Sequence, residues 1–132
     1  MKKVTNEWLD RAKDDLDTIK EIISKQYLTN IVAFHSQQAI EKCFKAIIEE
    51  FEIGFIKEHN LEVLLNKIEK YINFEINIQL LKEVNKIYTI SRYPGELGLL
   101  PDGKPTIKQA KHFFEFAKNI FEKINSFLQK SE

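Results

Sequence analysis

The chain has 132 residues, and its 20 basic and 20 acidic residues give a formal net charge of zero. A chain of this length predicts a single domain with one hydrophobic core, residues 1–132. The balanced charge argues against a protein that attracts nucleic acid or anionic membrane through its overall field. No apolar run approaches the ~20 residues that a membrane span needs, so we expect a cytoplasmic protein with no membrane segment.

Apolar residues recur at three- and four-residue steps along almost the whole chain, and no region shows sustained alternation. This pattern predicts an all-α protein, an up-and-down bundle of about five helices. The predicted helices cover residues from about 5 to 24, 29 to 51, 61 to 72, 77 to 90 and 106 to 128. Residues suited to cap helices precede three of them, namely Thr29 or Asn30, Asn60, and Thr106 with Gln109. The second helix is expected to be central, because its apolar arc of roughly 160° is wide enough for several neighbours.

Residues 92–105 are predicted to form a long loop. All three prolines and three of the four glycines fall in this range. Proline and glycine predict turns here rather than another helix. A loop of about fourteen residues is long for a compact domain, and loops of that length are often functional.

The second helix carries a polar stripe beside its apolar arc, formed by His35, Gln38, Lys42, Lys45 and Glu49. His35 lies at the boundary between the stripe and the arc. A histidine in this position is suited to carry a proton or to hydrogen-bond a nucleotide base or phosphate. The alternative is a half-buried histidine whose hydrogen bond is satisfied by a neighbouring backbone carbonyl.

Arg92 and Tyr93 stand at the start of the long loop. Arg92 offers a planar fork of donors that suits phosphate or carboxylate, and Tyr93 is able to stack on a base. Alternatively, Arg92 caps the carbonyls at the end of the fourth helix. The polar stripe and the loop together predict a ligand site made of His35, Gln38, Lys42, Arg92 and Tyr93.

The sequence contains no recognisable catalytic or metal-binding motif, so we assign no catalytic residue, metal or cofactor. His59 and His112 lack metal-ligand spacing to another histidine or to the single cysteine, Cys43. Cys43 lies in a helical apolar pattern and is expected to be a small buried side chain. Five of the ten phenylalanines fall in the last helix, which favours a homodimer interface there.

Five segments occur in an order and spacing typical of one family. They are Trp8 with Ala12 and Asp15-Leu16, residues 34–42 with Lys45-Ala46, His59-Asn60-Leu61, residues 91–95, and Ala110 with Ala117. This arrangement resembles the HEPN domain, which is named for nucleotide binding in higher eukaryotes and prokaryotes. The similarity covers nearly the whole chain.

The resemblance implies an all-α bundle of about five helices that commonly forms homodimers. It also implies a frequent partner, a minimal nucleotidyltransferase encoded alongside in a two-component, often toxin–antitoxin-like system. Many HEPN proteins are metal-independent ribonucleases that use an Arg followed, after four to six residues, by a His. Neither Arg92 nor Arg11 is followed by a His in that window.

Three hypotheses follow. The first is a HEPN-type module that binds a nucleotide or a nucleotidyltransferase partner at the predicted site. The second is a ribonuclease toxin with a non-standard active site, in which His35 acts as acid or base on RNA. The third is a structural dimerisation protein that binds another protein and no small ligand.

Overall fold

The computed structural model describes residues 1–92 and 104–130, without the side chains of residues 90–92. The described part is helical, and contains no strand. Its elements are α1 (Lys3–Ile22), the 3₁₀ helix η1 (Gln26–Leu28), α2 (Thr29–Glu50), α3 (Leu61–Ile68), the 3₁₀ helix η2 (Glu69–Tyr71), α4 (Ile78–Arg92) and α5 (Ile107–Lys130). The all-α fold and the five predicted helices are therefore confirmed.

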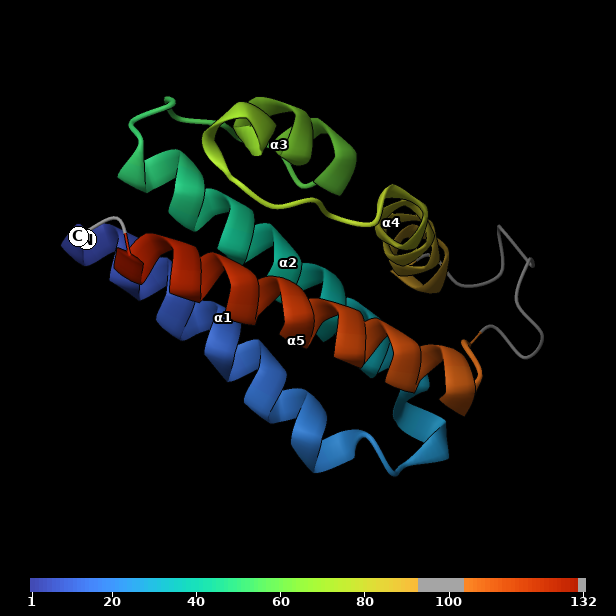
Figure 1. Ribbon diagram of the computed structural model, residues 1–132. Helices are drawn as coiled ribbons and strands as arrows, with labels where there is room; N and C mark the ends of the chain where they lie inside the picture. The colour runs from blue at the N-terminus through green and yellow to red at the C-terminus, as the bar shows by residue number, and fades with distance from the viewer. Residues whose placement is uncertain (93–103, 131–132) are drawn as a thin grey trace.

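The central position predicted for α2 is also confirmed. This helix contacts α1, α3, α4 and α5. In Figure 1, α1, α2 and α5 lie alongside one another, whereas α4 is seen nearly end-on and so crosses them steeply. Among the described helices, none combines the length and the apolarity needed to cross a bilayer.

The core forms around the apolar arc of α2. Eight residues of this arc are almost completely inaccessible to solvent: Val32, Ala33, Ala39, Ile40, Cys43, Phe44, Ala46 and Ile47. Cys43 is buried as predicted, and burial, with a smaller contribution from the nearby Asp15 carboxylate, raises the pKa of its thiol. This cysteine is therefore part of the packing.

Most of the aromatic surface of α5 is used within the chain. Phe113, Phe114 and Phe116 are buried, and Phe127 packs between Phe51 and Phe74 with ring-centroid distances of 6.1 Å to each. Each such aromatic pair adds roughly 0.5–1.5 kcal/mol beyond the area it buries. A homodimer remains a prediction, but these phenylalanines are largely occupied by the fold.

Two of the three capping predictions are confirmed. The Asn60 side chain accepts hydrogen bonds from the N–H groups of Glu62 and Val63 at 2.9 and 3.2 Å. The N–H of Thr106 donates to Gln109 Oε1 at 2.9 Å, and the N–H of Gln109 donates to Thr106 Oγ1 at 3.0 Å. This reciprocal pair is the predicted capping box.

The prediction that Thr29 or Asn30 caps α2 is wrong. The helix begins directly after η1, with Leu28 in the cap position and no side-chain capping bond. The Thr29 hydroxyl and the Asn30 side-chain oxygen are buried, and neither makes a hydrogen bond in the structure. Because η1 leads straight into α2, the preceding turn takes the place of a capping side chain.

The third helix is shorter than predicted. It ends at Ile68, η2 adds one more turn, and residues 72–77 are not helical. The sequence Ile-Asn-Phe-Glu-Ile-Asn-Ile from residue 72 to 78 alternates apolar and polar residues over this short stretch. The burial of the side chains follows the same alternation. The apolar residues Ile72, Phe74 and Ile76 are partly buried, and the polar residues Asn73, Glu75 and Asn77 are exposed.

Candidate functional site

Asp15 is a buried carboxylate at the interface of α1 and α2. One oxygen, Oδ1, lies 2.7 Å from His35 Nδ1, and the other, Oδ2, lies 2.7 Å from Lys42 Nζ. His35 and Lys42 are two turns apart on the same face of α2, so a single side chain from α1 contacts both. Only 7% of the Asp15 side chain is exposed, and its contacts with the Lys42 ammonium group and the His35 ring offset the cost of burying its charge.

The contact with Asp15 fixes the orientation and the tautomer of His35. An ionised carboxylate only accepts hydrogen bonds, so Nδ1 of His35 carries the hydrogen that it donates to Asp15. In a neutral ring, Nε2 is then the nitrogen with a free lone pair. A histidine oriented in this way is equipped to accept a hydrogen bond or a proton at Nε2.

Glu41 forms the second carboxylate centre, on α2 itself. Its side chain is 6% exposed, and its Oε2 lies 3.2 Å from Lys45 Nζ and 3.0 Å from His59 Nδ1. Its Oε1 accepts a hydrogen bond from Gln37 Nε2 at 3.2 Å. Gln37 in turn accepts a hydrogen bond at Oε1 from Gln38 Nε2, at 2.8 Å. Each of the two buried carboxylates therefore contacts one lysine and one histidine.

The loop that carries His59 is held at its end, where it leads into α3. Gln37 Nε2 donates to the carbonyl oxygen of His59 at 2.9 Å, and Asn85 Oδ1 in α4 accepts from the N–H of Leu61 at 3.1 Å. Glu58 accepts from the N–H groups of Asn60 and His59, both at 3.0 Å, and these two bonds lower the pKa of its carboxyl. His59 is thus positioned beside α2 although 71% of its side chain is exposed.

We call this set the α1–α2 network: Asp15, His35, Gln37, Gln38, Glu41, Lys42, Lys45 and His59. Its two carboxylates balance its two lysines, and each protonated histidine adds a positive charge. The ammonium group of Lys45 also lies 5.7 Å from the centre of the Trp8 ring. The network can therefore offer lysine, histidine and amide groups to an anionic ligand along the polar side of α2.

The structure brings three of the five predicted site residues into this network. His35, Gln38 and Lys42 all belong to it. Arg92 is the last residue of α4, but its side chain lies outside the described atoms, and Tyr93 lies outside the described residues. Whether Arg92 contacts a ligand or caps α4 therefore stays a prediction.

An aromatic contact connects α4 to the network. The Phe34 ring stacks on the ring of Tyr88 in α4 at a centroid distance of 5.8 Å and meets the ring of its neighbour His35 edge-on at 5.1 Å. Arg92 follows Tyr88 by one helical turn. The backbone of Arg92 is thus one turn beyond a residue in contact with Phe34.

Sequence reasoning missed the two carboxylates as site residues, although both carry a signal. Asp15 lies three residues after Ala12 and four before Ile19, which places it on the buried face of α1. Glu41 lies on one face of α2 with Phe44 and Ile48. A charged residue in an apolar stripe predicts a buried charge, and a buried charge needs a partner.

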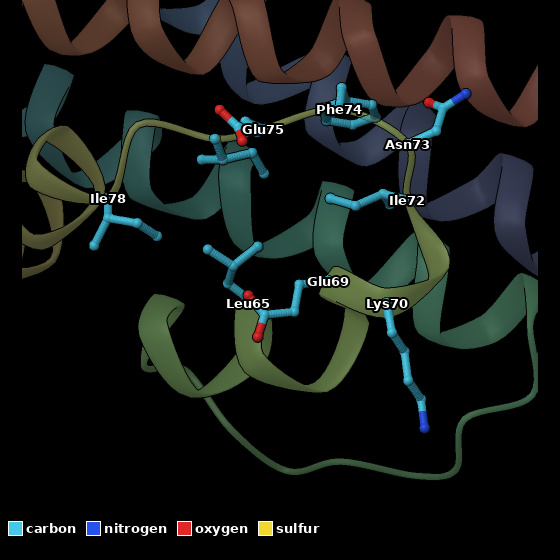
Figure 2. A pocket seen from close by; sticks show the side chains of 9 residues that line it. Leu65, Glu69, Lys70, Ile72, Asn73, Phe74, Glu75 and Ile78 are labelled. Carbon is cyan, nitrogen blue, oxygen red and sulfur yellow. The ribbon is translucent and has the colours of Figure 1, made fainter.

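The described part of the chain holds no cluster of three or more His, Cys, Asp or Glu side chains that is suited to bind a metal ion. His112 lies on the exposed side of α5, in a different part of the chain from the network. A pocket of about 610 Å³ is also separate from it, because its lining comes from α3, η2 and the residues that follow (Figure 2).

Comparisons with known proteins agree on the fold and the family. The family model described as the HEPN domain matches residues 5–127. The crystal structure of ST0689, an archaeal HEPN homologue, superposes with a TM-score of 0.70, covering 96% of this chain and 98% of that one at 23% identity. Among curated proteins, none matches this chain in sequence. The match of the family model over almost the whole length shows that the chain belongs to the HEPN domain family.

Proposed function

We propose that this HEPN protein is a binding module, the helical component of a two-component system with a minimal nucleotidyltransferase. At the predicted site, Arg92 would hold the phosphate groups of a nucleotide and Tyr93 would stack on its base. His35, Gln38 and Lys42 of the α1–α2 network would line the wall of the site, or the same residues would contact the partner itself. The observation that carries this proposal is that buried carboxylates hold a histidine and a lysine in place at the polar face of α2. Side chains fixed before binding lose less conformational entropy when a ligand arrives.

The partner-binding part of the proposal is supported by an apolar surface beside the network. Tyr27, Ile31 and Phe34 are 65%, 36% and 39% exposed. Their spacing of four and three residues places them along one side of the η1–α2 segment, and Phe34 directly precedes His35. Large exposed apolar side chains next to ordered polar groups are typical of protein interaction sites.

The nucleotide-binding part is tested by isothermal titration of ATP into the purified protein. We expect saturable binding that weakens at least about tenfold in Arg92→Ala, because the guanidinium fork would be lost from the phosphate groups. Lys86→Ala is the matched control, since Lys86 is exposed on the same helix. No binding to the wild type, or an equal loss in the control, would contradict this role.

The partner is tested separately by mixing the purified chain with a minimal nucleotidyltransferase, which the proposal expects to be encoded beside it. Size-exclusion chromatography should show one complex, and Phe34→Asp should disrupt it by placing a charge in the apolar surface. Val63→Asp is the control, because Val63 is also partly exposed, at 39%, but lies on α3. Separate elution of the two wild-type proteins would contradict the partnership.

RNA cleavage is the second candidate, and one contact favours it. Asp15 holds Nδ1 of His35 at 2.7 Å, which leaves Nε2 as the basic nitrogen, the arrangement that a general base requires. In this case the protein purified away from every partner should cleave RNA, and His35→Ala should remove at least about 99% of the activity. If His35→Ala cleaves RNA as fast as the wild type, His35 is not the acid or base.

A further inference from the structure

The segment between η2 and α4 is an extended stretch of backbone in a helical protein. Ile72 has φ −105° and ψ 155°, the chain bends at Asn73 and Phe74, and residues 75–77 continue to α4 without a turn. From Ile72 to Ile76, no backbone hydrogen bond outside helices is present, and the segment has no strand partner among the described residues. Its alternating burial is that of a strand with one face on a core. Backbone donors and acceptors are therefore left for water or a ligand.

A pocket of about 610 Å³ lies along this segment (Figure 2). Leu65 from α3 and Ile72 from the start of the segment point into it from different sides, and Ile78 lies at its far end. The pocket therefore joins an apolar floor to an edge of unpaired backbone. Extended peptides bind at such places, because the backbone pairs with an edge while alternate side chains enter a pocket.

Two carboxylates flank the pocket without a counter-ion. Glu69 comes from η2 and Glu75 from the extended segment, on opposite sides of the pocket in Figure 2. Neither forms an ion pair within the described part of the chain, and the ammonium group of Lys70 lies instead over the Tyr71 ring at 5.4 Å. Lys70 also lines the pocket, so its lining carries two carboxylates and one lysine, and this net negative charge complements a basic side chain.

We propose that residues 74–77 and the adjoining pocket bind an extended peptide segment of another protein. The peptide pairs with the unbonded backbone of Glu75 and Ile76, places an apolar side chain against Leu65 and Ile72, and directs a lysine or arginine to Glu69 and Glu75. This surface is separate from the α1–α2 network, and the proposal does not depend on the function proposed for that network.

The same observations disfavour two other occupants. A nucleotide would bring its phosphates into a pocket whose lining carries two carboxylates and one lysine, and this net negative charge repels them. A second copy of this chain, paired through the same segment in antiparallel register centred on Glu75, would place two glutamates directly opposite each other, which is destabilising. A basic, extended peptide has neither phosphates that the pocket repels nor a glutamate opposite Glu75.

The test uses three fluorescent, end-blocked heptapeptides with the purified full chain. One alternates valine and lysine, the second replaces each lysine with glutamate, and the third is the lysine peptide with N-methyl groups on alternate residues. Fluorescence anisotropy should show saturable binding of the lysine peptide, and binding at least about tenfold weaker for the other two. Equal binding of the N-methylated peptide would overturn backbone pairing, and no saturable binding of the lysine peptide would overturn the proposal.

Variants of the protein locate the surface. Glu75→Lys should weaken binding of the lysine peptide by roughly tenfold, because it places a like charge beside the peptide. Glu21→Lys is the matched control with the same change in net charge, since Glu21 is exposed on α1 and far along the chain from the pocket. Amide shifts in the ¹H–¹⁵N spectrum should concentrate at residues 65–78. Equal weakening by Glu21→Lys, or shifts concentrated outside residues 65–78, would overturn the assignment.

Discussion

The α1–α2 network and the pocket beside residues 72–78 both contain carboxylates, which are paired within the chain in the network and unpaired in the pocket. In the network, Asp15 and Glu41 each contact a lysine and a histidine of the chain itself. In the pocket, Glu69 and Glu75 form no ion pair with the described residues. Carboxylates of this chain therefore hold helices together in one region and remain free for a ligand in another.

The pairing of the charged groups also determines which new contacts a ligand can make at each surface. A ligand at the network meets lysines already paired with carboxylates, so it must gain from groups such as Nε2 of His35 that the network leaves unused. A ligand in the pocket meets unpaired charge and unpaired backbone, so most of its contacts are new. The following substitutions test this comparison, beginning with the largest expected effect.

Asp15→Ala should cause the largest loss of stability, about 3 kcal/mol. It removes a buried carboxylate and leaves Lys42 and His35 mostly buried without their partner, at 24% and 22% exposure. Urea unfolding followed by circular dichroism measures the change in free energy. Asp14→Ala, at an exposed position on the same helix, should change it by less than about 0.5 kcal/mol. Equal effects of the two substitutions would contradict the role given to Asp15.

Glu50→Gln should reduce stability by about 1 kcal/mol at neutral pH. Glu50 at the end of α2 accepts hydrogen bonds from the N–H of Lys2 and the hydroxyl of Thr5, both at 2.9 Å. The bond from Lys2, followed by that from Thr5, holds the pKa of Glu50 below its ordinary value of 4.5 despite the opposing effect of burial.

The lowered pKa of Glu50 gives this prediction a definite dependence on pH. Its stabilisation is fully present above about pH 4.5 and is lost as the pH falls through the lowered pKa of the folded state. Unfolding curves measured between pH 2 and 7 should therefore show wild type and Glu50→Gln converging at the acid end. A difference that stays constant over this range would show that the carboxylate charge is not responsible.

Glu75→Gln should have the smallest effect on stability, less than about 0.5 kcal/mol, because this exposed carboxylate has no ion pair to lose. The same urea measurement applies, and Glu69→Gln should behave alike. A loss comparable to that of Asp15→Ala would show that the pocket carboxylates stabilise the fold, and the contrast between the two regions would fail.

Much of the fold was predictable because it depends on local patterns. Helical periodicity gave the five helices, and the side chains of Asn60, Thr106 and Gln109 act locally, so their capping roles could be read directly. The segment after α3 was misread because Ile72 follows Ile68 by four residues and so continues the helical pattern. Because this spacing continues the helical pattern, Ile72 was assigned to the helix and the short alternation that begins there was overlooked.

The site was only partly predictable, because it depends on contacts between distant residues. The stripe of His35, Gln38 and Lys42 follows from helical spacing alone. Nothing local shows that Asp15, twenty residues before His35, accepts its hydrogen bond. The conflict between the charge of Asp15 and its apolar neighbours on α1 was the available signal, and it predicts a buried partner without identifying one.

The most direct test of the proposed function is a ¹H–¹⁵N spectrum of labelled protein, including the histidine ring nitrogens, recorded as ATP is added. The account predicts a saturable shift of Nε2 of His35, together with amide shifts at Gln38 and Lys42, and no change around residues 65–78. Shifts confined to residues 65–78, or no shift at millimolar ATP, would contradict nucleotide binding at the α1–α2 network.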